Sequence, residues 1–541
     1  MKEAIDITTE QRKTLLALLR RFIPGVVVWA YGSRVKWTAR INSDLDLVVF
    51  ATPVQRSMVS ELKEALAESD LPFLVDLHIW EDVPERFHEI IRKEYVVVQE
   101  VEKGMTYCSV GDVAAPTRNA LVGGPFGSDL VSRDYVPNGV PVIRGTNMGH
   151  GRWVDGEFVY VTPEKADSLA SNCAKPGDLV FTQRGTLGQV ALVPKKGTDR
   201  YLISQSQMKL TVDAKKSDAL FLYYVFTSAE QQAYIRQNAI QTGVPHTNLG
   251  ILRNTPLSLP PLAEQKTIAA VLGALDDKIE LNRRMNATLE AMARALFQSW
   301  FVDFDPVRAK LDGRRPVGID PTTAALFPKH FEHGEHDMFP VGWRLATIEE
   351  ISAINAWTLG KSDDLETLEY VEISEVSRGN IANIAIYPRG EEPSRARRRL
   401  RHGDTVLSTV RPDRGSYFLA LNPPENRVAS TGFAVLTPTK VPWSFIHAAL
   451  TQPEVSDHLG QMADGGAYPA VRPEIIGAIE VALPNEPKIL DAFHRACAPL
   501  FEQAEANRTQ SRTLAALRNS LLPKMLSGEL STASFEKEIS A

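Results

Sequence analysis

Two long stretches of the chain place an apolar or amide residue at every seventh position, which is the period of a coiled coil. The positions in the first stretch are Leu275, Asn282, Leu289 and Leu296, with Met285 and Met292 between them. Those in the second stretch are Leu500, Asn507, Leu514 and Leu521, with Leu517 between them. Each stretch has one asparagine at the same core position, where a buried amide lowers stability but disfavours other registers. We therefore predict two long helices that pack on each other, against the alternative that each packs only on its own globular domain.

The helices end the two copies of a larger internal repeat, which has a shift of about 225 residues. The Gly-Asp turn at 177–178 corresponds to the turn at 403–404, and a β-type apolar run follows each. TGVPHTNL (242–249) likewise corresponds to GGAYPAV (465–471). Short β-branched runs broken by Gly, Pro and Asn precede both helices. The sequence therefore predicts a β-rich unit of about 150 residues followed by a long helix, present twice.

The first part of the chain, up to about residue 100, lies outside this repeat and follows a different pattern. The apolar periodicity predicts helices at 10–21 and 57–68, and strands at 26–31, 44–50 and 73–80. This alternation of helices and strands is typical of a small α/β domain.

Composition adds that the protein has several domains. Its 541 residues, 44% of them hydrophobic and 23% charged, are more than one globular core usually holds. No apolar run is long enough to span a bilayer, and residues 1–16 lack the apolar segment of a signal peptide. Cys108, Cys173 and Cys497 have neither disulfide nor metal spacing. We therefore expect a cytoplasmic protein without membrane contact.

Charge gives a weaker indication about partners. The formal net charge is −6, which disfavours a nucleic-acid partner, because phosphate contacts need lysine and arginine. A local exception is PSRARRRLRHGD (393–404), which has five arginines within seven residues. By itself this run is more typical of a solvated loop or a sheet edge than of a DNA-binding patch.

Seven motifs follow one another between residues 104 and 530. They are GGPFGSDL (123–130), GVPVIRGTNM (139–148), KPGDLVFTQRGTLGQVALV (175–193), TGVPHTNL (242–249), LPPLAEQKTIAAVLGALDDKIELN (259–282), LFQSWFVDFDPVRAK (296–310) and LAALRNSLLPKMLSGEL (514–530). In this order they resemble the DNA-specificity (S) subunit of type I restriction-modification systems. The resemblance implies two target-recognition domains that each read half of a bipartite site in double-stranded DNA. It also implies central helices that dock two methyltransferase (M) subunits, restriction (R) subunits in the complex, and no catalytic residue or cofactor in this part.

The chain departs from the family pattern in two places. LPNEPK (483–488) stands where the first repeat has PPLAEQ, which leaves the start of the second helix open. Segment 304–340 is rich in Pro, Gly and His, and we expect it to be a solvated connector. Its histidines His330, His333 and His336 lack companion ligands for a metal.

Together these patterns predict an α+β multidomain fold. A small α/β nucleotidyltransferase-like domain precedes two β-rich target-recognition domains, each followed by a long helix, and the two helices pair as an antiparallel coiled coil. The expected boundaries are 1–103 for the first domain, 104–262 and 341–486 for the recognition domains, 263–303 and 487–530 for the helices, 304–340 for the connector and 531–541 for a tail.

Base edges in DNA are read by Arg, Asn, Gln and His side chains on ordered loops. The candidates in the first recognition domain are Arg144, Asn147, Gln183, Arg184, His246 and Asn248. Those in the second are Arg411, Arg414, Tyr468 and Arg472. All of them lie in motifs that resemble the family, where shared residues more often hold the scaffold than read a variable sequence.

The stretch GSRVKWTARINSDLDL (32–47) has the residues of a nucleotide-using catalytic site. Gly32 lets the backbone approach a phosphate closely, and Ser33 can hydrogen-bond a phosphate oxygen. Asp44 and Asp46 are two apart on a predicted strand, so both carboxylates point to one face. Such a pair can hold Mg²⁺, which bridges substrate phosphates. Asp76, on the next predicted strand, is the candidate third carboxylate, as a metal ligand or as the acceptor of a proton.

This spacing resembles the minimal nucleotidyltransferase superfamily, and the alternative is a plain turn beside a surface Asp pair. The resemblance implies Mg²⁺ and a nucleoside triphosphate as cofactors of a fused N-terminal domain. Two functions stay open. The first is a non-enzymatic specificity subunit whose N-terminal domain is accessory or inactive. The second is an active, protein-adenylylating, antitoxin-like nucleotidyltransferase that the DNA-recognition modules address to its target.

Overall fold

The computed structural model describes most of the chain, in the ranges 5–23, 25–40, 43–51, 56–99, 105–149, 151–195, 197–241, 245–333, 338–360, 363–466 and 469–530. The chain divides into two units, residues 1–274 with 518–541 and residues 275–517. Within the described ranges, no helix combines the length and the apolar character that crossing a membrane requires. The three cysteines are free thiols.

The N-terminal domain is a four-stranded sheet in the order β3-β2-β1-β4, with two helices packed on one face. Its elements are α1 (Thr9–Phe22), β1 (Val28–Tyr31), β2 (Leu45–Val49), α2 (Arg56–Ala67), β3 (Val75–Ile79), α3 (Glu85–Lys93) and β4 (Val96–Gln99). A capping box formed by Thr8 and Gln11 begins α1, whose Leu15 and Leu19 are buried against alternate strand residues. The helices and strands predicted from periodicity are therefore confirmed.

The first β-rich domain has two four-stranded sheets, in the orders β11-β10-β13-β6 and β8-β7-β12-β9. Its strands are β5 (Thr106–Ser109), β6 (Leu121–Gly123), β7 (Val140–Ile143), β8 (Val159–Val161), β9 (Cys173–Ala174), β10 (Leu179–Thr182), β11 (Val190–Leu192), β12 (Tyr201–Ile203), β13 (Gln207–Leu210) and β14 (Pro256–Leu259). Its helices are α4 (Val110–Val113), α5 (Pro163–Ser168), α6 (Ala219–Thr227), α7 (Ala229–Gln237) and α8 (Leu249–Asn254). Strand β14 pairs with β5 outside both sheets.

The second β-rich domain repeats this topology, with sheets β25-β24-β27-β18 and β22-β19-β26-β23 and the separate pair β17-β28. Its strands are β17 (Trp343–Thr347), β18 (Ser352–Ile354), β19 (Thr367–Val371), β20 (Val376–Ser377), β21 (Asn380–Ile381), β22 (Ala385–Pro388), β23 (Ala396–Arg399), β24 (Asp404–Ser408), β25 (Tyr417–Ala420), β26 (Arg427–Ser430), β27 (Phe433–Pro438) and β28 (Glu480–Pro484). Its helices are α12 (Ile348–Ile351), α13 (Trp443–Leu450), α14 (Pro453–Gln461) and α15 (Pro473–Gly477). The matching strand orders confirm the internal repeat, and the hairpin β20-β21 is an addition of the second copy.

The Gly-Asp turns of the repeat have one structural role in both copies. The Oδ2 atom of Asp178 accepts a hydrogen bond from the Lys175 amide at 2.8 Å, and Oδ2 of Asp404 accepts one from the Arg401 amide at 2.7 Å. Both aspartates are buried. Burial raises the pKa of Asp404 to about 6, although the Thr437 hydroxyl and the Arg401 amide donate to it. Each turn is therefore held by an aspartate that resists ionisation.

Replacing Asp404 with asparagine is expected to change the pH dependence of stability. The folded-state pKa of about 6 lies above the ordinary 3.8, so the stabilising effect of the bound proton is present in acid and is lost as pH rises through 6. The difference in the free energy of unfolding, variant minus wild type, should therefore rise by about 2–3 kcal/mol between pH 4 and pH 7.5. Urea unfolding followed by hydrogen exchange in residues 404–437 measures this difference. Glu425→Gln, at an exposed side chain, is the control, and a constant difference across pH would contradict the prediction.

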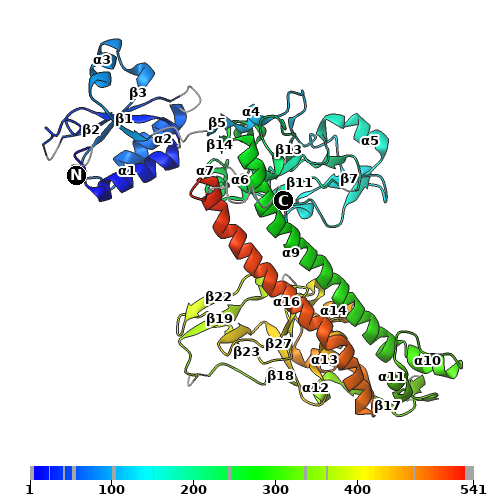
Figure 1. The fold of residues 1–541 in the computed structure, drawn as a ribbon. Coiled ribbons are helices and arrows are strands. Elements are labelled where there is room, and N and C mark those ends of the chain that lie inside the picture. Colours follow the sequence, from blue (N-terminus) through cyan, green and yellow to red (C-terminus); the bar gives the residue numbers. More distant parts are fainter. Residues whose placement is uncertain are drawn as a thin grey trace. The chain divides into compact units, whose positions relative to one another are not determined.

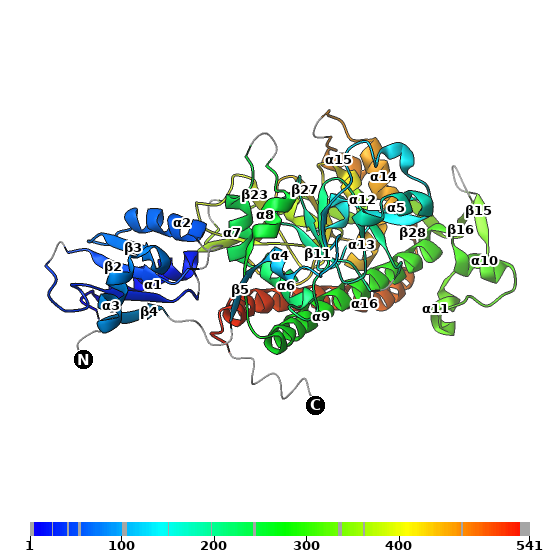
Figure 2. The same ribbon diagram turned by 90° about the horizontal axis from the view of Figure 1, so that it is seen from above.

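The two long helices are α9 (Leu262–Phe297) and α16 (Pro487–Leu526). Within the unit 275–517 they lie side by side and antiparallel (Figure 1, Figure 2). The Asn282 amide donates to the Asn507 carbonyl at 3.2 Å and to Gln510 Oε1 at 2.9 Å. The Asn507 amide in turn donates to Asn286 Oδ1 at 2.9 Å. The antiparallel pairing is confirmed, both predicted asparagines are buried within it, and α16 begins at Pro487 despite the divergent sequence before it.

The prediction that Met285 and Met292 lie in the interface between the two helices is wrong. Met285 is 38% exposed and Met292 is 49% exposed. The residues of α9 that are buried at this level are instead Asn282, Asn286, Ala293 and Phe297. They follow one another at spacings of four, seven and four residues, so they form one stripe of a helix. The buried stripe is therefore rotated away from the methionines.

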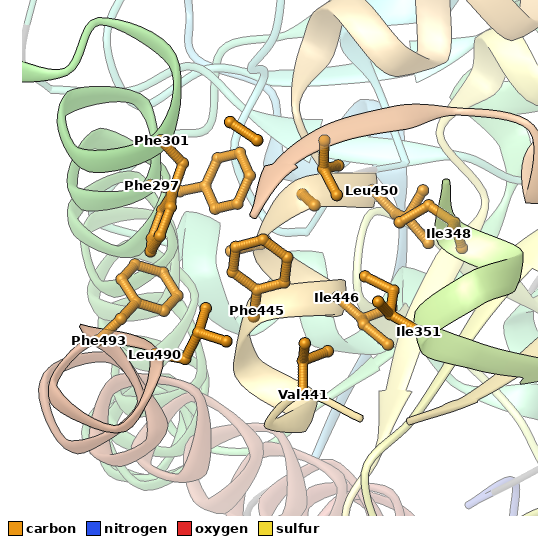
Figure 3. Packing of buried hydrophobic residues seen from close by; sticks show 14 of the residues in the cluster. Phe297, Phe301, Ile348, Ile351, Val441, Phe445, Ile446, Leu450, Leu490 and Phe493 are labelled. Carbon is orange, nitrogen blue, oxygen red and sulfur yellow. The ribbon is translucent and has the colours of Figure 1, made fainter. Parts of the chain in front are cut away.

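Segment 304–340, expected to be a solvated connector, is folded in its described part. After a π-helical turn at Gln298–Val302, it forms α10 (Asp305–Leu311), α11 (Pro321–Leu326) and the hairpin of β15 (Phe331–His333) and β16 (Met338–Pro340). Val307 and Phe327 are buried in the main core of the unit 275–517. Figure 3 shows another part of this core, where Phe297, Phe445 and Phe493 come from α9, α13 and α16. Of the three histidines in the segment, His336 lies outside the described residues.

Candidate functional site

Two of the three predicted carboxylates, those of Asp46 and Asp76, lie on the sheet face opposite α1 and α2. Asp46 on β2 pairs with Asp76 on the parallel strand β3, and with Tyr31 on the antiparallel strand β1. Their neighbours in each strand, such as Leu45, Leu47 and Leu77, point to the buried face. Asp44 directly precedes β2 and is exposed. The fold therefore places two of the three predicted carboxylates on adjacent strands at the same level.

Electrostatic coupling among these groups is visible in their pKa values. Burial raises the pKa of Asp46, and the charges of Asp76 and Asp44 raise it further. Burial likewise raises the pKa of Tyr31 to about 12, with contributions from Asp46 and Asp76. A face that disfavours further negative charge in this way is suited to a cation.

The Gly-Ser turn lies against the same carboxylate. Gly32 has a φ of 83°, and a Cβ atom placed on it would lie 2.1 Å from Oδ2 of Asp46. Only glycine combines this backbone conformation with so close a carboxylate. The turn is fixed because the amides of Lys36 and Thr38 donate to the carbonyls of Gly32 and Ser33, at 3.2 and 3.0 Å.

His78 belongs to the site, although the sequence analysis did not select it. Its Nε2 atom lies 3.0 Å from Oδ2 of Asp76. The two residues are two apart on β3, so strand alternation alone places them on one face. His78 therefore restrains the third carboxylate.

The carboxylates of Asp46 and Asp76 are of the kind and number that Mg²⁺ needs from a protein. Mg²⁺ is commonly held by one or two carboxylates together with substrate phosphates, and Asp46 and Asp76 provide two on adjacent strands. In the described part of the chain, no group of three or more His, Cys, Asp or Glu side chains is arranged to hold a metal ion by itself.

Aromatic rings cover the rest of this sheet face. Trp80 stacks on His88 of α3 with 4.0 Å between ring centroids, and Phe50 packs on Trp80 at 4.8 Å. Trp29 on β1 stacks on Tyr95 at 3.8 Å. Helix α3 therefore packs over the C-terminal ends of β2 and β3, beyond the level of the carboxylates.

The first β-rich domain brings three of its predicted DNA-contacting residues together. Arg184 forms an isolated β-bridge with His246, and the carbonyl of Gln183 accepts from the Thr247 amide at 3.0 Å. Residues 183–184 directly follow β10, so the strand positions this loop pair. Arg144 lies apart from them, on the turn after β7 in the other sheet.

The second β-rich domain forms the same loop pair. The Arg411 amide donates to the Pro469 carbonyl at 2.8 Å, and Val410 bridges Ala470. Arg414 lies in the short 3₁₀ helix Pro412–Arg414 that follows. Tyr468 lies outside the described residues. The two copies of the repeat therefore present corresponding loops with different side chains.

Burial and hydrogen bonding reassign some predicted contacts to the scaffold. Asn147 is fully buried, and its side chain bonds the Arg144 amide and the carbonyls of Asp155 and Glu157. Asn147 therefore holds the turn that carries Arg144, and its contact with DNA stays a prediction. Asn248 caps α8 by accepting from the Ile251 amide, and Arg472 occupies the N-cap position of α15.

The arginine run is an edge strand with acidic partners. It coincides with β23, at the edge of its sheet. Arg399 pairs with Asp363 at 3.2 Å and with Glu425 at 3.3 Å, and the guanidinium of Arg401 stacks on Trp357 at 3.2 Å. Much of its charge is therefore used within the domain, as the sheet-edge interpretation requires.

Two protein families match the chain. Residues 134–291 match the type I restriction modification DNA specificity domain. Residues 15–103 match the family described as polymerase beta, nucleotidyltransferase.

Relatives and a solved structure resemble the same two parts. The type I restriction enzyme HindI specificity subunit of Haemophilus influenzae is 25% identical over 460 residues, which cover 74% of this chain and 97% of the relative. The probable protein adenylyltransferase MntA of the same organism is 47% identical over 100 residues, 18% of this chain and 88% of the relative. The crystal structure of a type I restriction-modification S subunit from M. genitalium has a TM-score of 0.44 and 16% identity, and covers 78% of this chain and 96% of that one.

Proposed function

We propose that this chain is a specificity subunit of type I restriction-modification systems with a nucleotidyltransferase domain joined to it, and that it selects a bipartite DNA site and carries a nucleotidyl-transfer activity. The two family matches and the two relatives support this proposal. The observation that carries the first part is the duplicated domain, with one strand order in both copies. The corresponding loops differ in sequence, so each copy suits a different half-site. Gln183, Arg184 and His246 are the proposed contacts of the first copy, and Arg411 and Arg414 those of the second.

Two methyltransferase subunits and the restriction subunits are the proposed protein partners. Leu281, Met285 and Met292 form an exposed stripe on α9, at spacings of four and seven residues. Apolar side chains in such a stripe are typical of helix-in-groove docking, and methionine adapts to different partner surfaces. The methionines that do not pack against α16 are therefore proposed to pack against a methyltransferase subunit.

The carboxylate face supports the second part of the proposal. In nucleotidyl transfer, an acceptor hydroxyl oxygen bonds to the α-phosphorus, the bond to the bridging oxygen breaks, and pyrophosphate leaves with the electron pair. Asp44 and Asp46 are proposed to hold Mg²⁺, which would neutralise the phosphate charge. Asp76 is proposed either to complete this metal site or to take the hydroxyl proton, and Gly32 and Ser33 are proposed to hold the phosphates.

The acceptor is proposed to be a protein of the same assembly. MntA is named as a probable protein adenylyltransferase, and covalent linkage raises the concentration of the domain around proteins that bind the specificity subunit. The alternative function is an adenylylating enzyme that the DNA-recognition modules address to its target. One observation favours it, since the N-terminal match is 47% identical and the specificity-subunit match is 25% identical.

The first test is to co-express the chain with its methyltransferase subunit and to map methylated adenines in the host genome. The expected result is methylation at a bipartite motif with a fixed gap. Arg184→Ala should relax the motif in one half and Arg414→Ala in the other. Lys215→Ala, at an exposed lysine in a turn of the first β-rich domain, is the control and should leave the motif unchanged.

The outcomes separate the two functions. A bipartite motif that persists in the double variant Asp44→Ala, Asp46→Ala assigns site selection to the β-rich domains alone. If no methylation is found under any condition, the specificity function is overturned. The remaining function is then a nucleotidyltransferase that the DNA-recognition modules direct to its target.

A further inference from the structure

Trp37 has an unusual backbone conformation for a large side chain. Its φ is 55°, in the left-handed region that bulky residues rarely adopt. Its side chain is 42% exposed, so part of the indole is accessible to solvent. Strain of this kind concentrates at ligand sites, and Trp37 lies between the Gly-Ser turn and Asp44.

The turn that carries Trp37 is built on the proposed phosphate-binding residues. The residues on either side of it, Lys36 and Thr38, donate their amides to the carbonyls of Gly32 and Ser33. The Thr38 hydroxyl donates to the same Ser33 carbonyl at 3.4 Å. The backbone at Trp37 is therefore tied to the Gly-Ser turn.

The same turn is linked to a second exposed aromatic residue. Lys36 Nζ lies 3.6 Å from Oε2 of Glu94, and the next residue, Tyr95, is 38% exposed. Tyr95 stacks on Trp29 with an interplanar angle of 16°. Trp29 is two residues before Tyr31 on β1 and so shares the face of the carboxylates. Aromatic surface thus borders this face close to the Gly-Ser turn.

We propose that the indole of Trp37 is the stacking platform for the nucleobase of the nucleoside triphosphate. This inference rests on the proposed nucleotidyltransferase function. Stacking uses the π-face that every base has, and its strength grows with ring area, so the platform favours purine over pyrimidine nucleotides. The Gly-Ser turn and the carboxylates bind the triphosphate, and Trp37 binds the base.

The test compares a ligand that has a base with one that lacks it. The full-length wild type, Trp37→Gly and Trp37→Phe are titrated calorimetrically with ATP and with inorganic tripolyphosphate, each with Mg²⁺. Trp37→Gly should weaken ATP binding about tenfold or more and leave tripolyphosphate binding unchanged. Trp37→Phe should lie between it and the wild type. Phe87→Ala, at a ring that is also 42% exposed, is the matched control and should bind both ligands normally.

A stability measurement separates binding from folding. Glycine adopts a left-handed φ without strain, and this relief offsets packing lost with the indole, so Trp37→Gly should melt within a few degrees of the wild type while it weakens ATP binding. Equal ATP affinity in Trp37→Gly and the wild type, or equal loss of ATP and tripolyphosphate, would overturn the inference alone. A wild type that binds neither ligand would overturn the nucleotidyltransferase function and the inference with it.

Discussion

Replacing Asp46 with asparagine is expected to lower the rate of nucleotidyl transfer on the order of 10²–10³-fold and to raise the thermal stability of the N-terminal domain. The rate falls because the neutral amide binds a divalent cation poorly beside Asp76. The stability rises because burial and the charges of Asp76 and Asp44 raise the pKa of Asp46, so its ionised form is disfavoured in the fold at neutral pH. Transfer of labelled adenylate from ATP to the partner subunits gives the rate, and calorimetric melting gives the stability.

The opposite signs of these two changes distinguish a functional residue from a structural one. Asp70→Asn, at an exposed acid of the same domain, is the matched control and should change neither quantity. A loss of both activity and stability in Asp46→Asn would assign Asp46 a structural role. Unchanged transfer would remove it from the active site.

The elements of the N-terminal domain were predicted well because the patterns that indicate them involve residues close together in the chain. The spacing of the Asp-x-Asp pair after the Gly-Ser pair was enough to select Asp44 and Asp46, and alternation along a strand indicated that such a pair shares a face. The pairing of Asp46 with Asp76 was less accessible, since it depends on the register between two strands. His78 could have been found, because it stands two residues after Asp76. The conformation of Trp37 has no local signal, since nothing in the residue type indicates a positive φ.

Predictions that depend on packing partners were less complete. A seven-residue period fits more than one stripe of a helix, and the partner decides which stripe is buried. The pattern therefore found Asn282 and Asn507 but missed Asn286, and it placed Met285 in the core. Segment 304–340 was expected to be solvated because it is rich in Pro, Gly and His, although it also has aromatic residues such as Phe327. Phe327 is buried because it packs against residues that are distant in the sequence. Asn147 was selected for its residue type, although its hydrogen bonds join its own turn to the segment that contains Asp155 and Glu157.

The ion pair between the two long helices gives the other large expected effect. Arg508 of α16 pairs with Glu290 of α9, and their side chains are only 12% and 16% exposed. The turn of hairpin β20-β21 packs on this pair, because a Cβ atom placed on Gly379 would lie 2.6 Å from Nη2 of Arg508. Burial raises the pKa of Glu290 although Arg508 and Arg294 lower it. The carboxylate therefore depends on its arginine partners to remain ionised.

Arg508→Ala should consequently lower the free energy of unfolding of residues 275–517 by about 3–5 kcal/mol, because it leaves a buried carboxylate without its main partner. Hydrogen exchange in residues 282–290 and 500–510 under increasing urea measures the loss. Arg512→Ala, which removes a more exposed pair with Glu505, should cost less than about 1 kcal/mol. The double variant Arg508→Met, Glu290→Leu should recover most of the stability, since apolar side chains of similar size replace a buried pair at little cost. Without that recovery, the loss in Arg508→Ala would reflect packing of the arginine side chain rather than the charge of Glu290.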